Sequence, residues 1–476
     1  MPAIEKLEAK VASEVFSSQK STSELWRTEP LKARISRLLK IQEWTKNNRK
    51  SIQDAIYNDF KKPAAEVDLS EIYLVLSEIK HALKNLHLWA KPKKAESTLA
   101  LLGTKSYVYY EPKGVCLIIS PWNFPFNLTV GPLVSALAAG NTVILKPSEL
   151  TPNCSGLIAR MVAEIFDPSE VAVFNGGKEV AENLLQLPFD HIFFTGSPAV
   201  GKIVMQHAAR HLTPVTLELG GKSPAIIDRT ADITDAAEKL VWGKFINGGQ
   251  TCIAPDYLLV EESVEEALLD NLRRLIDQFF DPEGFGIETS SSYARVIGTK
   301  HFDRLDSMLT DALEMGSEIE CGGVVNKADN YFAPTVLSNV PQTARVMNEE
   351  IFGPILPLIT YQDISEVIEL INSKPKPLAL YIFSKSSEFQ NKVLQETSSG
   401  SVAINDCVIQ FMNPNLPFGG INQSGFGKSH GHSGFLAFSN QKSVLKQKTG
   451  LTSVKPLFPP YTKLTRKAID FLLKYL

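Results

Sequence analysis

Between residues 114 and 219 the chain alternates short apolar segments with helix-like segments, and this alternation constrains the fold more than any other feature. The apolar segments are 114–119, 142–145, 171–174, 191–194 and 215–219. Their apolar composition is typical of strands that are covered on both faces. Strands that alternate with helices predict an α/β fold with a parallel, doubly wound sheet, whose ligand lies beyond the carboxyl ends of the strands.

The segments on either side extend this α/β pattern. Residues 1–95 have apolar residues at three- and four-residue spacing, which predicts helices. Residues 107–112 have the composition of a strand and end at a proline, which favours an edge or hairpin strand. A second α/β series runs from about 222 to 423, and the tail after Pro456 contains an amphipathic segment. Its apolar face consists of Leu464, Ala468, Phe471, Leu472 and Tyr475.

Composition and charge exclude several classes of protein. Of the 476 residues 44% are hydrophobic, and the net charge of −3 is too balanced to indicate nucleic acid as the main partner. The five cysteines show no CxxC spacing and the eight histidines no HExxH pattern, so we expect neither a disulfide scaffold nor a metal site. The N-terminus carries acidic residues early and lacks the apolar segment of a secretory signal. We therefore expect a cytoplasmic enzyme with reduced thiols.

One of the five cysteines lies in a loop that suits chemistry. Cys252 follows Gly248 and Gly249, which allow a tight turn and the close approach of a ligand, and it precedes Pro255, which keeps the backbone out of a regular helix. The other cysteines lie in strand-like or polar segments without such a loop. Cys252 is therefore the candidate nucleophile, although a single free cysteine is more often a small buried apolar residue.

Two residues at predicted strand ends are candidate partners of Cys252. Glu218 lies between two leucines, where desolvation raises the pKa of a carboxyl group toward the range of a general base. Asn123 lies in a loop stiffened by two prolines and two aromatic residues, from which its amide could donate to an oxyanion together with the backbone N–H of Cys252. The alternatives are a strand-end glutamate that caps a turn and an ordinary turn asparagine.

Several residues after the predicted strands suit an anionic cofactor. Gly196 and Ser197, at the start of a helix, would present free N–H groups to a phosphate. Lys146 and Glu149 follow the second apolar segment and could hold sugar hydroxyls. No GxGxxG motif follows the first apolar segment, so the usual dinucleotide fingerprint is absent.

The loop 349–354 adds a carboxylate, Glu350, close to an aromatic ring, Phe352. By themselves these two residues would be a helix cap and a core phenylalanine. The loop is informative because it is one of a series of motifs that runs along nearly the whole chain.

Together these motifs closely resemble those of the aldehyde dehydrogenase superfamily, in the family's order and over about residues 10–450. They are Pro-Trp-Asn-Phe-Pro (121–125), Lys-Pro-Ser-Glu (146–149), Phe-Thr-Gly-Ser (194–197), Leu-Glu-Leu-Gly-Gly-Lys (217–222), Gly-Gln-Thr-Cys (249–252), Glu-Glu-Ile-Phe-Gly-Pro (349–354) and Pro-Phe-Gly-Gly (417–420). No single motif is specific, but the combination is. The short N-terminus and the segments 252–257 and 376–381 look most like the class 3 branch, which includes fatty and aromatic aldehyde dehydrogenases.

The resemblance implies NAD(P)-dependent oxidation of a medium- or long-chain aliphatic, or an aromatic, aldehyde to the carboxylic acid. Cys252 would form a thiohemiacetal and then a thioester, Asn123 would hold the oxyanion, and Glu218 would activate the water that hydrolyses the thioester. Many class 3 members have Ser where this chain has Gly248 and Tyr where it has Phe124. Both departures border the catalytic loops and bear on substrate preference.

The resemblance also assigns the cofactor contacts. Lys146 would contact the adenine ribose, Glu350 the nicotinamide ribose and Phe352 the nicotinamide ring, whereas Gly196 and Ser197 would line the pyrophosphate and nicotinamide region. Glu149 could accept ribose hydroxyls and repel a 2′-phosphate, so NAD is favoured, although class 3 relatives often use both NAD and NADP.

Family members share a three-part layout and are typically dimers in class 3. The three parts expected here are an NAD(P)-binding domain (1–93 and 113–220), a catalytic domain (221–423) and bridging strands (94–112 and 439–452). A C-terminal tail helix (453–476) follows them. The basic, amphipathic tail has two interpretations: it packs on a partner subunit near the substrate entrance, or it makes a weak contact with a membrane surface.

Three rival functions stay open. A thiol hydrolase would use Cys252 and Glu218 without a cofactor, but the cofactor motifs argue against it. A CoA-acylating dehydrogenase would release the thioester to CoA, but such relatives usually lack the base at Glu218. A structural protein built on the same fold is the third, and the presence of nucleophile, base and oxyanion residues argues against it.

Overall fold

The computed structural model describes residues 2–98, 101 and 103–474. The N-terminal part is helical, as the spacing of its apolar residues predicts. Its helices are α1 (Pro2–Trp26), α2 (Leu31–Asn47), α3 (Arg49–Phe60), α4 (Ala64–Val67) and α5 (Tyr73–Trp89), and a π-helical segment, Asp68–Ile72, joins α4 to α5.

The first large sheet is the parallel one that the sequence predicts. Its strands are β3 (Val115–Ile119), β4 (Thr142–Lys146), β5 (Val171–Val173), β6 (His191–Gly196) and β7 (Val215–Leu219), in the order β7-β6-β3-β4-β5. A short strand from much later in the chain, β17 (Gly425–Phe426), pairs antiparallel with β7 and completes the sheet. The intervening helices are α6 (Asn127–Ala139), α7 (Pro152–Ile165), α8 (Lys178–Leu184) and α9 (Pro198–Ala209).

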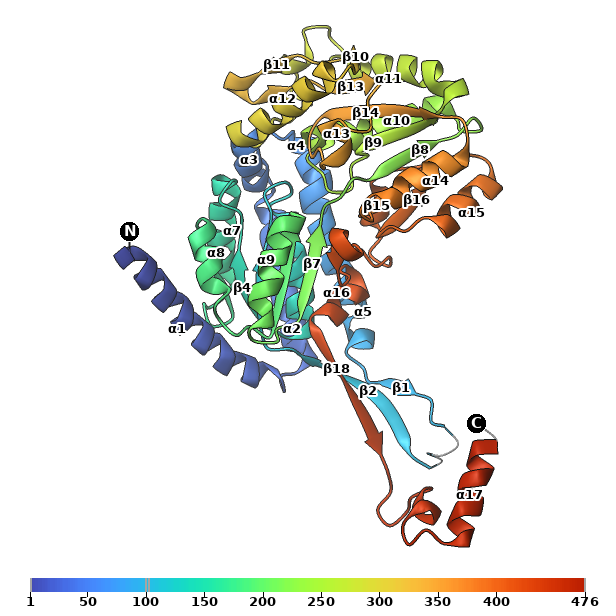
Figure 1. Cartoon of the computed structure of the whole chain (residues 1–476). Helices are drawn as coiled ribbons and strands as arrows, with labels where there is room; N and C mark the ends of the chain where they lie inside the picture. Colours follow the sequence, from blue (N-terminus) through green and yellow to red (C-terminus); the bar gives the residue numbers. More distant parts are fainter. Residues whose placement is uncertain (1, 99–100, 102, 475–476) are drawn as a thin grey trace.

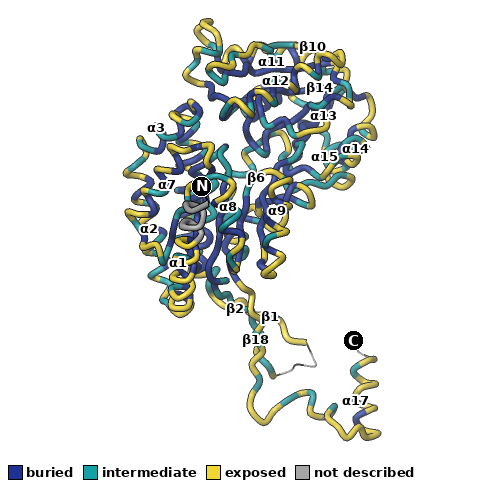
Figure 2. Tube along the Cα trace, turned by 60° about the vertical axis from the view of Figure 1, so that its left-hand side comes forward, coloured by how far each residue is buried: buried dark blue, intermediate teal, exposed yellow. Residues whose placement is uncertain are grey.

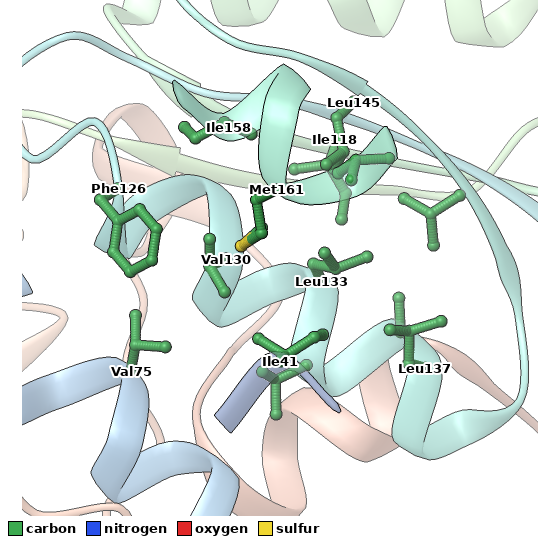
Figure 3. Close-up of a cluster of buried hydrophobic side chains, with 14 of the residues drawn as sticks. Ile41, Val75, Ile118, Phe126, Val130, Leu133, Leu137, Leu145, Ile158 and Met161 are labelled. Carbon is green, nitrogen blue, oxygen red and sulfur yellow. The ribbon is translucent and has the colours of Figure 1, made fainter. Parts of the chain in front are cut away.

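Helix α6 is apolar almost all round because other elements cover it on every side. It lies between β3 and β4 on one face and helices α2, α5 and α16 (Gly431–Ala437) on the other. Figure 3 shows Val130, Leu133 and Leu137 of this helix pointing among side chains from the sheet and the N-terminal helices. This packing fixes the loop between β3 and α6, which carries Asn123.

The second large sheet belongs to the later α/β series. Its order is β10-β13-β14-β9-β8-β15-β16, and only β10 runs antiparallel to its neighbour. The strands are β8 (Pro224–Ile227), β9 (Tyr257–Glu261), β10 (Glu318–Cys321), β13 (Thr335–Ser338), β14 (Ile355–Tyr361), β15 (Ala379–Phe383) and β16 (Ser401–Ile404). The helices around it are α10 (Ile233–Phe245), α11 (Glu265–Phe280), α12 (Thr299–Glu314), α13 (Arg345–Asn348), α14 (Ile364–Ser373) and α15 (Ser387–Glu396), and β11 (Val325–Asn326) pairs with β12 (Tyr331–Phe332) beside it.

A third, three-stranded sheet projects away from these two bodies as an arm (Figure 1). Its strands are β1 (Lys93–Ala95), β2 (Lys105–Pro112) and β18 (Ser439–Lys446), all antiparallel, and the arm is largely exposed in Figure 2. The edge alternative for the strand near Pro112 is wrong: β2 is the middle strand, paired with β1 as a hairpin and with β18. The proline is tolerated because it is the last residue of the strand, opposite Ser439.

The tail ends in helix α17 (Lys463–Lys474), which confirms the amphipathic helix that the sequence predicts. Leu464 and Phe471 of its apolar face are exposed, whereas Tyr475 lies outside the described residues. None of the described helices has the length and apolar character needed to cross a bilayer.

Candidate active site

The loop that carries Cys252 turns sharply just before the cysteine. Asn247, Gly248 and Gly249 all have positive φ, at 56°, 60° and 73°. A Cβ atom on Gly249 would lie 2.3 Å from the carbonyl oxygen of Gly353, so only glycine lets this loop approach the 349–354 loop so closely. The double glycine therefore brings two predicted parts of the site together.

Side-chain amides tie the Cys252 loop to the Asn123 loop. Asn247 Nδ2 donates to the carbonyl oxygen of Asn123 at 2.9 Å, and Asn123 Nδ2 donates to the carbonyl oxygen of Gln250 at 3.0 Å. Gln250 in turn bonds to the backbone of Asn247, Arg295 and Ile297. The Asn123 amide is thus directed at the backbone two residues before Cys252.

Glu218 lies one residue before the end of β7 and is 5% exposed. Its Oε1 accepts a hydrogen bond from Ser429 Oγ at 2.8 Å, and its Oε2 accepts none from the described residues. Burial raises the pKa of this carboxyl group to about 8, against the hydrogen bond from Ser429 and the charge of Lys428. The desolvation that the sequence predicts for Glu218 is therefore present, and it puts the pKa in the range of a general base.

The Cys252 side chain is half-buried and lies among negative charges. Burial raises the pKa of its thiol to about 12, and the carboxylates of Glu350 and Glu218 add to the effect. The thiol is accordingly protonated at neutral pH, and it needs a proton acceptor before it can attack.

Cys252 and Glu218 line one cavity, whose walls are mostly apolar. The volume of this cavity is about 140 Å³. The apolar and aromatic side chains in its walls include Leu69, Leu74, Phe124, Leu128, Trp242, Ile246, Ile253, Met412, Phe411 and Phe418. Such a cavity suits an apolar ligand with one reactive polar end near the thiol.

The residues of the first sheet that the sequence predicts to bind a cofactor lie at the carboxyl ends of its strands. Lys146 ends β4 and bonds through Nζ to Glu149 Oε2 at 2.8 Å, and Gly196 ends β6. Helix α9 starts directly after Ser197, whose Oγ accepts from the Val200 N–H at 3.4 Å. The chain proceeds from β3 to β4 on one side and from β6 to β7 on the other, so β3 and β6 flank the switch point where such sheets bind nucleotides.

These residues fit a dinucleotide. The α9 N-terminus offers backbone N–H groups for phosphate. Gly196, just before it, leaves the space open because it has no side chain, and a Cβ there would also collide with the Phe194 ring at 2.6 Å. Lys146 and Glu149 place a cation and a carboxylate, bonded to each other, at the end of β4, where they could meet sugar hydroxyls. The described residues contain no cluster of three or more histidine, cysteine, aspartate or glutamate side chains suited to a metal ion.

Glu350 and Phe352 come to the same site from the second sheet. The Glu350 carboxylate packs against Gly220, where a Cβ would lie 2.3 Å from its Oε1, and burial raises its pKa to about 7. Phe352 has a φ of 47°, and its ring meets Trp122 edge to face at 5.3 Å between centroids. Strain of this kind persists where the surroundings enforce it, as at ligand sites.

Some residues of the site escaped sequence reasoning. Ser429, which binds the Glu218 carboxylate, lies 211 residues away in the chain and belongs to no expected part. Arg304 holds the 349–354 loop by donating to the carbonyl oxygens of Glu350 and Ile351. Lys222 donates to the carbonyl oxygens of Val346 and Glu349, at the start of this loop, and forms an ion pair with Asp256. Only Lys222 carried a signal, because it ends the 217–222 motif.

Comparisons with known proteins identify the family of this chain. The model of the aldehyde dehydrogenase family matches residues 3–444. A 4,4'-diaponeurosporen-aldehyde dehydrogenase of Staphylococcus aureus is 44% identical over 95% of this chain and 97% of its own length. Aldehyde dehydrogenase family 3 member A2 of Mus musculus is 43% identical over 91% of this chain and 88% of its own length. The structure titled substrate bound state of Staphylococcus aureus AldH matches with a TM-score of 0.92 and 43% identity, over 97% of this chain and 99% of that chain. The chain belongs to the aldehyde dehydrogenase family.

Proposed function

We propose that the protein oxidises an aldehyde to the carboxylic acid with NAD(P)+, through a thioester on Cys252. The observation that carries the proposal is that Cys252 and the raised-pKa carboxyl of Glu218 line one apolar cavity. The relatives named above are aldehyde dehydrogenases, which supports the same reaction.

Three residues perform the first half of the reaction. Glu218 Oε2, in the same cavity, first takes the thiol proton and passes it to solvent water. The Cys252 sulfur then bonds to the aldehyde carbon, and the carbonyl oxygen takes up the electron pair. The Asn123 amide and the Cys252 backbone N–H donate to this oxygen; for that, Asn123 Nδ2 exchanges the Gln250 carbonyl for the oxyanion. A bound NAD(P)+ would supply the acceptor for the hydride of the same carbon, and the thioester would then remain on Cys252.

Glu218 performs the second half. One of its oxygens is held by Ser429, so the other, Oε2, can take a proton from water in the cavity. The hydroxide that results attacks the thioester carbon, the carbon–sulfur bond breaks and the acid leaves, and the Cys252 sulfur takes the proton from Glu218, so that the thiol returns. A pKa near 8 makes the carboxylate a stronger base than an exposed glutamate.

The cavity walls support a medium- or long-chain aliphatic or an aromatic aldehyde. The aromatic and aliphatic residues listed above offer apolar contact along the cavity. One relative is named as a 4,4'-diaponeurosporen-aldehyde dehydrogenase, which supports an aldehyde as the substrate here.

Lys146, Glu149, Gly196, Ser197, Glu350 and Phe352 would bind the cofactor in the roles that the resemblance assigns. Glu149 supports NAD over NADP, because a carboxylate that accepts hydrogen bonds from ribose hydroxyls would repel a 2′-phosphate. We further propose a cytoplasmic homodimer with domains at the boundaries expected above. The exposed apolar side chains of the arm and α17 support subunit contact there, and the basic charge of α17 supports the alternative of a weak membrane contact.

The test is NAD(P)H formation with straight-chain aldehydes of increasing length and with benzaldehyde. Cys252→Ala removes the nucleophile, and Cys321→Ala is the matched control because Cys321 is also half-buried but lies on β10. We expect turnover by the parent and by Cys321→Ala, and none by Cys252→Ala.

The same assay separates the rival functions. Ester cleavage without NAD(P)+ binding would indicate a thiol hydrolase, and NAD(P)H formation that requires CoA would indicate a CoA-acylating enzyme. If the protein neither oxidises any aldehyde nor hydrolyses an ester, the remaining interpretation is a structural protein built on the same fold.

A further inference from the structure

Behind the loops that carry Asn123 and Cys252, a lysine lies buried beside two carboxylates. Lys62 and Glu71 are both 0% exposed, and Lys62 Nζ lies 3.3 Å from Glu71 Oε1. Burial lowers the pKa of Lys62, and the charges of Glu71 and Glu66 offset only part of this effect. Removing one member of such a group leaves an uncompensated charge away from water, so its members depend on one another.

Each carboxylate binds the main chain of one catalytic loop. Glu71 Oε2 accepts from the Asn127 N–H at 2.8 Å, at the start of α6 and directly after the loop of Asn123. Glu66 Oε2 accepts from the Asn247 N–H at 2.9 Å, where the chain enters the turn that leads to Cys252. The two carboxylates therefore anchor two loops that are distant in sequence.

Lys62 also touches the first loop directly. Its ammonium group lies 4.0 Å from the centroid of the Phe124 ring, within the range of a cation–π contact. Phe124 follows Asn123 in the chain and lines the cavity, as does Glu66. Since the two loops are joined by the Asn247–Asn123 hydrogen bond, a shift of either one moves the Asn123 amide relative to Cys252.

We propose that Lys62, through Glu66 and Glu71, is a positioning residue that holds the Asn123 amide in place for the oxyanion formed at Cys252. The inference rests on the function proposed above. Without the lysine, Glu71 loses the cation paired with it at a fully buried site, and Glu66, which is partly exposed at the cavity wall, loses a favourable charge nearby. They then take up protons, and a neutral carboxyl group is a weaker acceptor for the two backbone N–H groups.

A partly buried ion pair elsewhere supplies a control. Arg37 pairs with Glu29, its side chain is 11% exposed, and its guanidinium lies 3.3 Å from the centroid of the Trp26 ring. Its ion pairs with Glu29 and Glu170 and its contact with Trp26 involve neither catalytic loop. Arg37→Met thus removes a cation with similar partners and leaves the Asn123 loop alone.

The experiment is a double-mutant cycle on the full chain. Lys62→Met and Arg37→Met are each made with Asn123 intact and with Asn123→Ala, and kcat and KM for a straight-chain aldehyde are measured beside thermal melting. We expect Lys62→Met to lower kcat about 10- to 100-fold, because a displaced oxyanion donor loses most of its effect, with kcat/KM falling equally. With Asn123→Ala the further loss should be less than about twofold, since no amide is left to misplace.

Arg37→Met should lower the melting temperature and leave kcat within about twofold of the parent, as expected for a distant surface-side pair. The inference is overturned if Lys62→Met lowers kcat by the same factor in both backgrounds, or if Arg37→Met lowers it as much. An inactive parent overturns the proposed function and this inference with it, whereas an active parent with an unaffected Lys62→Met overturns this inference alone.

A second pair of variants serves if Lys62→Met does not fold. Glu66→Gln keeps an oxygen that accepts from the Asn247 N–H, and Glu66→Ala does not. We expect Glu66→Gln to retain kcat within about threefold and Glu66→Ala to lose about tenfold or more, again only when Asn123 is present. Equal kcat for Glu66→Ala and the parent would overturn the inference.

Discussion

Glu218→Gln should make the protein more stable at pH 8 while it removes most of the activity. The glutamine keeps the shape of the side chain and an oxygen that accepts from Ser429 Oγ. It removes a negative charge that is 5% exposed and whose Oε2 accepts no hydrogen bond from the described residues. Ionisation of Glu218 in the native structure is therefore disfavoured.

The magnitude follows from the pKa. Burial raises the pKa of Glu218 from 4.5 to about 8, so between these values the folded protein binds a proton that the unfolded chain has lost. The free energy of unfolding due to this group therefore falls as the pH rises from 4.5 to 8, and below 4.5 the group has no effect. At about 1.4 kcal/mol for each tenfold change in proton affinity, the loss between pH 5 and pH 8 is about 3 kcal/mol. Glutamine does not titrate, so the variant escapes this loss.

The assay is urea denaturation of parent and variant at pH 5 and pH 8. We expect the variant to gain about 3 kcal/mol relative to the parent on going from pH 5 to pH 8. All other titrating groups are shared by the two proteins and cancel in the comparison. Aldehyde turnover should fall about 10²- to 10⁴-fold, the range for loss of a general base. A stability difference that does not change with pH would refute the raised pKa, and full turnover would refute the role as base.

Three further predictions concern the Cys252 loop, the cofactor and the proposed base. Gly249→Ala should cost about 1–3 kcal/mol of stability and lower kcat, because its Cβ would lie 2.3 Å from the carbonyl oxygen of Gly353. The control is Gly284→Ala, since Gly284 has a similar φ of 75° and no atom within 4 Å of a Cβ. Denaturation and rate measurements are made on both variants. Glu149→Gln should raise kcat/KM for NADP+ relative to NAD+ by up to about tenfold, since a repulsive charge is lost, and an unchanged ratio in steady-state kinetics would contradict the proposed role. Ser429→Ala removes a hydrogen bond that lowers the pKa of Glu218, so the rise of kcat with pH should move to higher pH; a pH–rate profile identical to that of the parent would argue against this.

The elements of the first sheet could be predicted because their information is local. The apolar segments 142–145 and 191–194 became β4 and β6 within two residues, since a strand buried on both faces needs a continuous apolar composition. The burial of Glu218 could be predicted for the same reason, because it lies between leucines at the end of such a strand. The position of β2 in the middle of its sheet could not be, because its second partner, β18, lies more than 300 residues later.

The sequence by itself determined which residue types stand in which loops, and through them the α/β class, the family resemblance and the candidates Cys252, Glu218 and Asn123. Only the tertiary structure decided what surrounds each of them. Ser429 reaches Glu218 across 211 residues, and Lys62, inside a helical region without any motif, proves to lie behind both catalytic loops. Motifs record local chemistry, whereas desolvation, close approach and charge pairing depend on distances in space, which arise only when the chain packs.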